Sequence, residues 1–323
     1  MGYYTPLSGR PRSSSSTSAR GQRSASAPSP AAQEKAAEAQ RLLDALQAIT
    51  DLPRREFPAA EPGVPPPLPE VDARAILRRH AQQARAGVSV FDRAARRTAR
   101  VGARAGAETE VRSLEETLAQ RQLEWQREIE GEWRGLRANE PRIVLSRLAS
   151  AFEDNQAAAA AVGVLHEEVS LIAVVPGVEV VPERKPTTTA KGNLSLKKLT
   201  KRETADVYKL VVCGHVLATL KECFATAPGI SSARIVAVRA AGHGDDGRRR
   251  PEAVMAARVS RSALAGVRWQ SVDAAQILSD AASELVATQR GVSKELQPLD
   301  VTQQPDLGTL LDAVDFDEMT GQG

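Results

Sequence analysis

The strongest constraint on this chain is a helix-length apolar run that starts at a clear capping signal. Thr200 and Glu203 have the spacing of a capping box, in which each side chain accepts a hydrogen bond from the backbone amide of the other residue. The segment that follows, residues 207–217, is apolar nearly all round at helical spacing, and a Pro-Gly pair stops the helix. Because such a helix has to be buried, we expect residues 200–227 to be the central helix of a packed domain.

Short segments rich in β-branched residues flank this helix. The expected elements, in chain order, are a helix at 141–155, a linker or helix extension at 157–161, strands at 168–175 and 178–181, a polar loop at 182–200, the central helix, an antiparallel strand pair at 230–240 and 253–259, and a helix at 273–289. This order predicts an α+β fold, in which a small α/β sandwich with a central long helix and a mixed sheet occupies residues 141–290.

The two ends of the chain have a different composition. Residues 1–70 are rich in Ser, Pro and Arg, so we expect a disordered arm and a proline-rich linker with one short helix over 30–49. Residues 291–323 are expected to be an acidic tail with a short helix around 307–316.

Residues 71–140 have the character of a charged, coiled-coil-like helical region. An apolar stripe recurs at spacings of three, four and seven residues from Val111 to Leu136. Residues 74–104 carry nine Arg against a single acid, whereas residues 105–140 carry nine acids against five bases. We therefore predict an antiparallel helical hairpin, or a coiled coil, that pairs the two parts by charge.

The formal net charge of +3 hides strong segregation of charge. Residues 1–24 carry four Arg and no acid, while residues 298–323 carry six acids and no base. Such blocks are typical of solvated faces and of surfaces that bind a charged partner. We expect a protein partner or self-association through residues 71–140, with nucleic acid as a further candidate, bound through its phosphate backbone. The candidate anion-binding residues are Lys191, Lys197, Lys198, Lys201 and Arg202.

One tripeptide suggests catalysis. Glu183, Arg184 and Lys185 place an acid and a lysine two residues apart, and this pattern resembles the E-x-K element of the restriction-endonuclease-like nucleases. The resemblance implies Mg²⁺-dependent phosphodiester cleavage, with Glu179 or Glu153 as a further carboxylate. The tripeptide is flanked by two prolines, which favours a loop. No catalytic residue is assigned; Glu183, Lys185 and Glu179 are the candidates, and Mg²⁺ is expected only if the nuclease alternative holds.

The central helix also carries polar side chains. Tyr208 and His215 lie seven residues apart on one face, and we interpret them as core filling rather than as an acid–base pair. Cys213 and Cys223 would lie about 15 Å apart along the helix, too far for a disulfide. No Cys-x-x-Cys spacing indicates a metal site, and no cofactor is expected.

The sequence has no apolar run long enough to cross a bilayer, so we expect a cytoplasmic protein. Without a convergent set of reactive residues, the leading hypothesis is a non-enzymatic interaction or scaffold protein. It would act through the charged helical region and the small α/β domain. The alternative is a nucleic-acid-associated protein, in its sharper form the nuclease described above.

Overall fold

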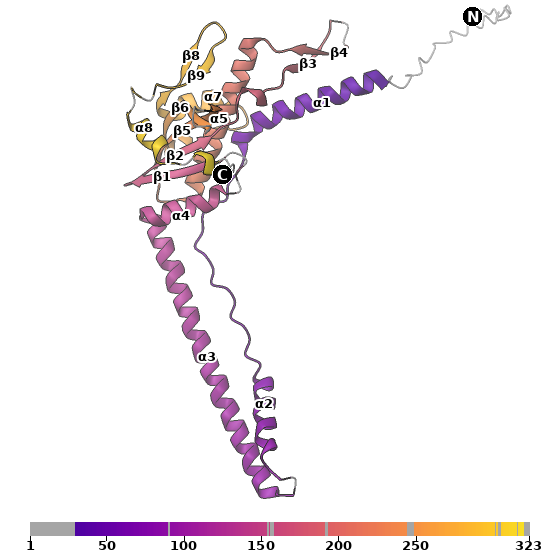
Figure 1. Cartoon of the computed structure of the whole chain (residues 1–323), viewed down its shortest axis with the longest axis vertical. Coiled ribbons are helices and arrows are strands. Elements are labelled where there is room, and N and C mark those ends of the chain that lie inside the picture. Colours follow the sequence, from indigo (N-terminus) through magenta and orange to yellow (C-terminus); the bar gives the residue numbers. More distant parts are fainter. Residues whose placement is uncertain are drawn as a thin grey trace, which may run out of the picture.

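The computed structural model shows an α+β body from which a long helical stalk projects (Figure 1). The residues described are 30–319, except 90, 154, 156, 157, 191, 192, 244–248, 301, 303, 304 and 315. Residues 1–29 of the arm and linker expected over residues 1–70 lie outside this range, as does Lys191. Within the described residues, no helix has both the length and the apolar character needed to cross a membrane.

The central helix is α5 (Lys201–Thr226), as predicted. The Thr200 side chain accepts a hydrogen bond from the Glu203 amide at 3.2 Å, and the Glu203 carboxylate accepts one from the Thr200 amide at 2.8 Å. Fourteen of its residues are buried, among them Val212, Leu217 and Leu220. The helix is buried because it packs across the sheet and contacts other elements on its remaining sides.

The central sheet has five strands in the order β1-β2-β5-β6-β7. Their bounds are β1 (Ala159–Leu165), β2 (Glu168–Val174), β5 (Ser232–His243), β6 (Arg249–Ser260) and β7 (Ala282–Val286). Only β2 and β5 are parallel, and α5 is the crossover between them. The sheet is therefore mixed, as expected, and the strand pair β5–β6 is antiparallel.

Three local predictions were wrong, and sheet pairing explains two of them. Residues 159–161, expected as a linker or helix extension, belong to β1 because they pair with β2. The helix expected over 273–289 ends early as α7 (Ala274–Ala281), because residues 282–286 pair with β6 as the edge strand β7. Residues 178–180 form a short 3₁₀ turn, η2 (Val178–Val180), rather than a strand.

The prediction of a polar loop over residues 182–200 is also wrong in part. It folds as an antiparallel hairpin of β3 (Arg184–Thr188) and β4 (Leu194–Lys198), separate from the central sheet. A second small hairpin joins β8 (Thr288–Arg290) to β9 (Glu295–Gln297), and α6 (Arg261–Leu264) follows β6 directly. The polar composition of residues 182–200 concealed the first hairpin, whose strands are only half-buried and contact α1, a helix far away in the sequence.

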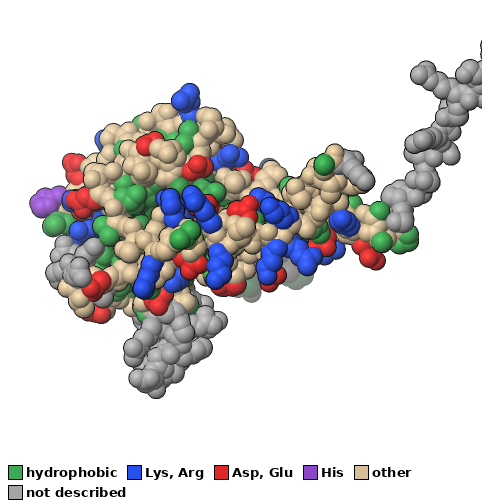
Figure 2. Space-filling model, turned by 90° about the horizontal axis from the view of Figure 1, so that it is seen from above, with side chains coloured by type: hydrophobic (Ala, Val, Ile, Leu, Met, Phe, Trp, Pro, Cys, Tyr) green, Lys and Arg blue, Asp and Glu red, His purple; other side chains and the backbone are tan. Residues whose placement is uncertain are grey.

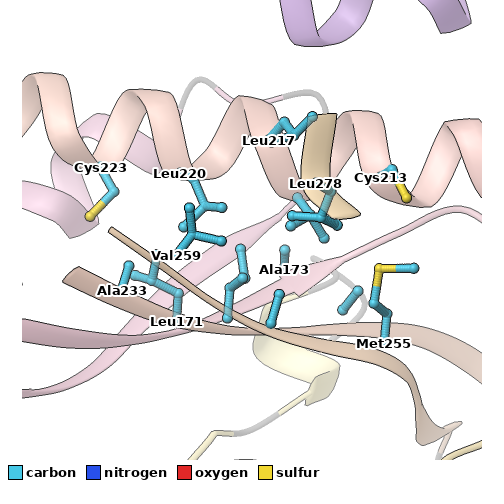
Figure 3. Close-up of a cluster of buried hydrophobic side chains, with 14 of the residues drawn as sticks. Leu171, Ala173, Cys213, Leu217, Leu220, Cys223, Ala233, Met255, Val259 and Leu278 are labelled. Atoms are coloured by element: carbon cyan, nitrogen blue, oxygen red, sulfur yellow. The ribbon is translucent and has the colours of Figure 1, made fainter. Parts of the chain in front are cut away.

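The two faces of the sheet bury alternate residues, as the period of a strand requires. Leu171 and Met255 face α5 (Figure 3), and Ile235, the cross-strand partner of Leu171, belongs to the same main core. Ile172 and Val236 face the other side, where Leu299, Leu307 and Phe316 of the C-terminal segment cover them. This segment contains α8 (Pro305–Asp312) and α9 (Phe316–Met319). The acidic tail is therefore in part a structural layer of the sandwich.

The stalk is a helical hairpin, as predicted, but its turn lies earlier than the change of charge. α2 (Ala73–Ala86) packs against α3 (Arg93–Arg137), a single helix of 45 residues, and the described residues of the connection are 87–89, 91 and 92. Gly106 lies within α3, where a Cβ atom would come within 3.1 Å of His80 Nδ1. Glycine at this position therefore allows close approach of the two helices.

The described part of the segment expected to be an arm and linker lies against the body and the stalk. α1 (Pro30–Asp51) contacts α5 and β3, and the 3₁₀ turn η1 (Leu52–Arg54) follows it. Lys221 of α5 donates a hydrogen bond to the Pro53 carbonyl oxygen at 3.0 Å, and the Ala60 amide donates to the Ala225 carbonyl at 2.8 Å. From there the chain runs along α3 towards α2 (Figure 1).

The two cysteines provide a direct test of this core. Cys213 and Cys223 are free thiols on the sheet-facing side of α5 (Figure 3), and burial raises the pKa of each to about 12. We expect neither thiol to react with a thiol-specific disulfide reagent in the folded protein at pH 8, and both to react in denaturant. Fast labelling of either cysteine in the native protein would contradict this packing of α5.

Candidate functional site

The E-x-K tripeptide lies at the small hairpin and not in the central sheet. Glu183 is exposed just before β3, and Lys185 is half-buried within it. The Lys185 ammonium donates to Glu203 Oε1 at 2.6 Å, and this contact, with the Thr200 bonds, lowers the pKa of Glu203 to about 2. In this arrangement Lys185 connects the hairpin to the capping box of α5.

Three other candidate residues line one pocket. Glu153, Glu179 and His215 border a hollow of about 820 Å³ at the carboxyl ends of the parallel strands β2 and β5. We call it the carboxyl-end pocket; ligands often bind at this edge of an open sheet. Its other lining is mostly apolar, and its Asn155 donates through Nδ2 to the buried Glu222 carboxylate at 2.5 Å. The nuclease hypothesis had named both glutamates, but as companions of Glu183.

Tyr208 and His215, the two polar residues of α5 singled out above, lie in different environments. Tyr208 is buried, and its hydroxyl donates to the Pro176 carbonyl oxygen at 3.1 Å. His215 is half-buried, and burial, helped by the charge of Arg55, lowers its pKa to about 4. The imidazole is therefore neutral at pH 7. Across the part of the chain that the structure describes, no three His, Cys, Asp or Glu side chains form a group that could hold a metal ion.

The predicted anion-binding residues gather at one end of the body. Lys197 and Lys198 lie on β4, and Lys201 and Arg202 in the first turn of α5; all four are exposed. We call these four residues the basic patch. Arg184 and Lys198 are cross-strand partners, which brings further positive charge to the hairpin. Figure 2, which looks down on this end, shows Lys and Arg side chains interspersed with Asp and Glu.

A second basic site lies at the far end of the stalk, where α2 turns into α3. We call residues 85–100 the apex. Its arginines are Arg85, Arg93, Arg96, Arg97 and Arg100. Asp92, the one acid there, accepts a hydrogen bond from the Ala95 amide at 2.9 Å and so caps α3. Among the described residues, none of these five arginines forms an ion pair.

The apex is positioned by contacts that the sequence reading did not identify. Glu110 of α3 binds both Arg79 and His80 of α2, with 2.6 Å between the carboxylate and His80 Nε2. These bonds lower the pKa of Glu110. Ile76 of α2 and Ala107 of α3 are buried in the same contact. The apex arginines therefore lie beyond Glu110, and also beyond Glu108, which is bound to Arg104 at 3.0 Å.

The sequence did contain the signals for the apex. The block of nine Arg in 74–104 and the isolated Phe91 are both visible in it. Spacing alone could not show which arginines are neutralised, because Glu110 becomes their neighbour only when the hairpin closes. Comparisons of this chain with models of protein families, with curated proteins and with solved structures found no match.

Proposed function

We propose that this chain is a non-enzymatic interaction protein in which the stalk holds a binding apex away from the α/β body. One observation carries the proposal: five arginines with no ion-pair partner among the described residues lie at the end of a helix of 45 residues. A helix of that length spans about 68 Å. Positive charge concentrated at such a distance from the body favours an anionic partner.

The apolar stripe of α3 supports the role of spacer rather than partner site. Ile129 packs against Gly63 of the chain's own extended segment, 3.5 Å from the position of a Cβ atom there. Trp133 is half-buried and packs against the main core. The body-proximal part of the side of α3 that a coiled-coil partner would occupy is thus contacted within the chain, and the apex is the contact we propose.

The contacts between the end of α3 and the body support a rigid attachment of the stalk. Leu136 at the end of α3 is buried in the main core, and the Asn139 amide Nδ2 donates to the Gly229 carbonyl oxygen at 3.0 Å. A Cβ atom at Gly229 would lie 2.5 Å from the Arg137 carbonyl oxygen, so only glycine allows this approach. Because the stalk is anchored in this way, its apex keeps a fixed position relative to the body.

The second candidate is nucleic-acid association through the basic patch. It is favoured by the exposure of Lys197, Lys198 and Lys201, which make no ion pair within the described ranges. Carboxylates lie nearby, however: Arg184 is 3.8 Å from Glu38, and Arg202 is 4.0 Å from Asp206. The nuclease form of this candidate depends on Glu183 and Lys185, whose lysine is bound to Glu203.

Two variants with the same change of net charge separate the candidates. The apex variant replaces Arg93, Arg96, Arg97 and Arg100 with Gln, and the patch variant replaces Lys197, Lys198, Lys201 and Arg202 with Gln. We expect the apex variant to leave immobilised heparin at much lower salt, with the log–log salt slope of binding reduced by about 3–4. We expect the patch variant to elute close to the wild type.

The opposite pattern would support the second candidate. If the patch variant alone loses retention on heparin and on duplex DNA, the basic patch is the anionic contact and the apex proposal is wrong. Equal small losses in both variants would show a general effect of net charge and would also contradict it. Circular dichroism of each variant checks that the helices are intact.

A further inference from the structure

The apex contains a built hollow as well as a cluster of charges. About 260 Å³ of space lies between the end of α2 and the start of α3. The lining residues are Ala81, Ala84, Arg85, Val88, Arg96, Ala99 and Arg100. The space exists because alanines face each other where larger side chains would fill the gap between the helices. Three arginine side chains thus line one hollow, and no Asp or Glu is among its lining residues.

The chemistry of this lining matches a phosphate group. Guanidinium groups donate in a planar fork that fits phosphate oxygens, and several of them around one space neutralise a dianion. Arg96 is half-buried, so part of its side chain is already removed from water before a ligand arrives. The one acid of the apex is engaged as the cap of α3. The site therefore has donors for an anion and no competing carboxylate in its lining.

An exposed aromatic residue in the connection between α2 and α3 favours one class of phosphate-bearing partner. Phe91 lies in the turn between the helices and is 95% exposed. Aromatic rings are stable at the boundary between headgroups and acyl chains, while arginines bind the phosphates above them. Nucleic acids are instead bound in grooves with several stacking aromatics, and the apex is a protruding end with one such residue. The arrangement favours a lipid surface over a single nucleic-acid strand.

We propose that the apex binds the phosphate groups of an anionic phospholipid surface, with Phe91 inserted among the headgroups. The inference rests on the proposed function, because it names the anionic partner of the same apex. The stalk would then hold the α/β body about 68 Å from the lipid. A cytoplasmic membrane leaflet, which is negatively charged, has the required chemistry.

Vesicle co-sedimentation of the full chain tests this inference. We expect binding to phosphatidylcholine vesicles that contain phosphatidylserine and none to phosphatidylcholine alone. Replacing Arg85, Arg96 and Arg100 together with Gln should weaken binding on the order of a hundred-fold, given the typical contribution of a base near an anionic leaflet. Phe91→Ala should weaken it about ten-fold while leaving the charge unchanged.

Matched controls make the result specific. Arg112, Arg127 and Arg142 are exposed arginines without an ion pair among the described residues, so their replacement with Gln removes the same charge. Val292 is 90% exposed on the body, and Val292→Ala is the control for Phe91→Ala. Both control variants should bind vesicles like the wild type.

The outcomes distinguish this inference from the proposed function. One outcome is that the wild type does not bind anionic vesicles, while the apex variant defined above, with four arginines replaced, still loses heparin retention. The lipid inference is then wrong, and the proposal that the apex binds an anionic partner stands. If duplex DNA binds through the apex arginines at a salt where vesicles do not, the partner is a nucleic acid. If neither heparin nor vesicles respond to the apex arginines, both proposals are wrong.

Discussion

Replacing Arg261 with alanine is expected to lower the free energy of unfolding by about 3–5 kcal/mol. The guanidinium group closes the carboxyl end of α5, where helix carbonyls have no partner of their own. It donates to the Phe224 carbonyl at 2.6 Å, to the Ala227 carbonyl at 2.7 Å, and twice to the Ile230 carbonyl, at 2.7 and 2.9 Å. All three acceptor residues are buried, so water can replace only part of these bonds.

Urea denaturation of matched variants measures this loss. Arg268 is exposed on the same side of the body, and Arg268→Ala should change stability by less than about 0.5 kcal/mol. Arg261→Lys should recover only a minor part, because one ammonium group cannot reach three carbonyls in the same geometry. Equal stability of Arg261→Ala and Arg268→Ala would show that the carboxyl end of α5 is closed in another way.

The second large effect is acid destabilisation through His215. Its pKa is about 4 in the folded protein and 6.5 when unperturbed. Below pH 6.5 the imidazole of His215 therefore binds a proton in the unfolded chain but stays neutral in the folded chain. The free energy of unfolding falls as the pH is lowered from 6.5 to 4. Above pH 6.5 the contribution is fully present. The full loss is up to about 3 kcal/mol.

The comparison with His215→Gln isolates this effect. Glu168, whose pKa is lowered by Arg258, and Glu222, whose pKa is raised by burial, titrate in both proteins and cancel in the difference. Urea midpoints at pH 7.5 and pH 4.5 should differ more for the wild type than for His215→Gln. Parallel losses in the two proteins would mean that the imidazole is already solvated, and the carboxyl-end pocket would then be more open than the structure shows.

Local signals in the sequence were reliable where a short stretch defines its own partners. The capping box of Thr200 and Glu203 is such a case, because both halves of the motif lie within one turn. The antiparallel pairing of β5 and β6 is another, since the two strands follow each other closely in the chain. The strand expected at 168–175 is a third case, because its apolar run is β2, and Leu171 and Ile172 are buried on opposite sides of it.

Elements that depend on a distant partner could not be placed in this way. Residues 282–286 read as helix from their own pattern, and pairing with β6 makes them the edge strand β7. The acidic C-terminal segment looked like a solvated tail, yet Leu307 and Phe316 cover the second face of the sheet. In both cases the energy that decides the structure comes from burial or hydrogen bonds far along the chain.

The same distinction applies to the candidate sites. The sequence by itself determined the buried helix, the mixed α+β class and the segregation of positive charge into the stalk, because composition and spacing are local properties. Only the tertiary structure decided that Lys185 binds Glu203, that Glu110 is bound to α2, and that the apex arginines form no ion pair among the described residues. The physical reason is that an ion pair depends on distance in space, and the distance between two charges is set by the fold.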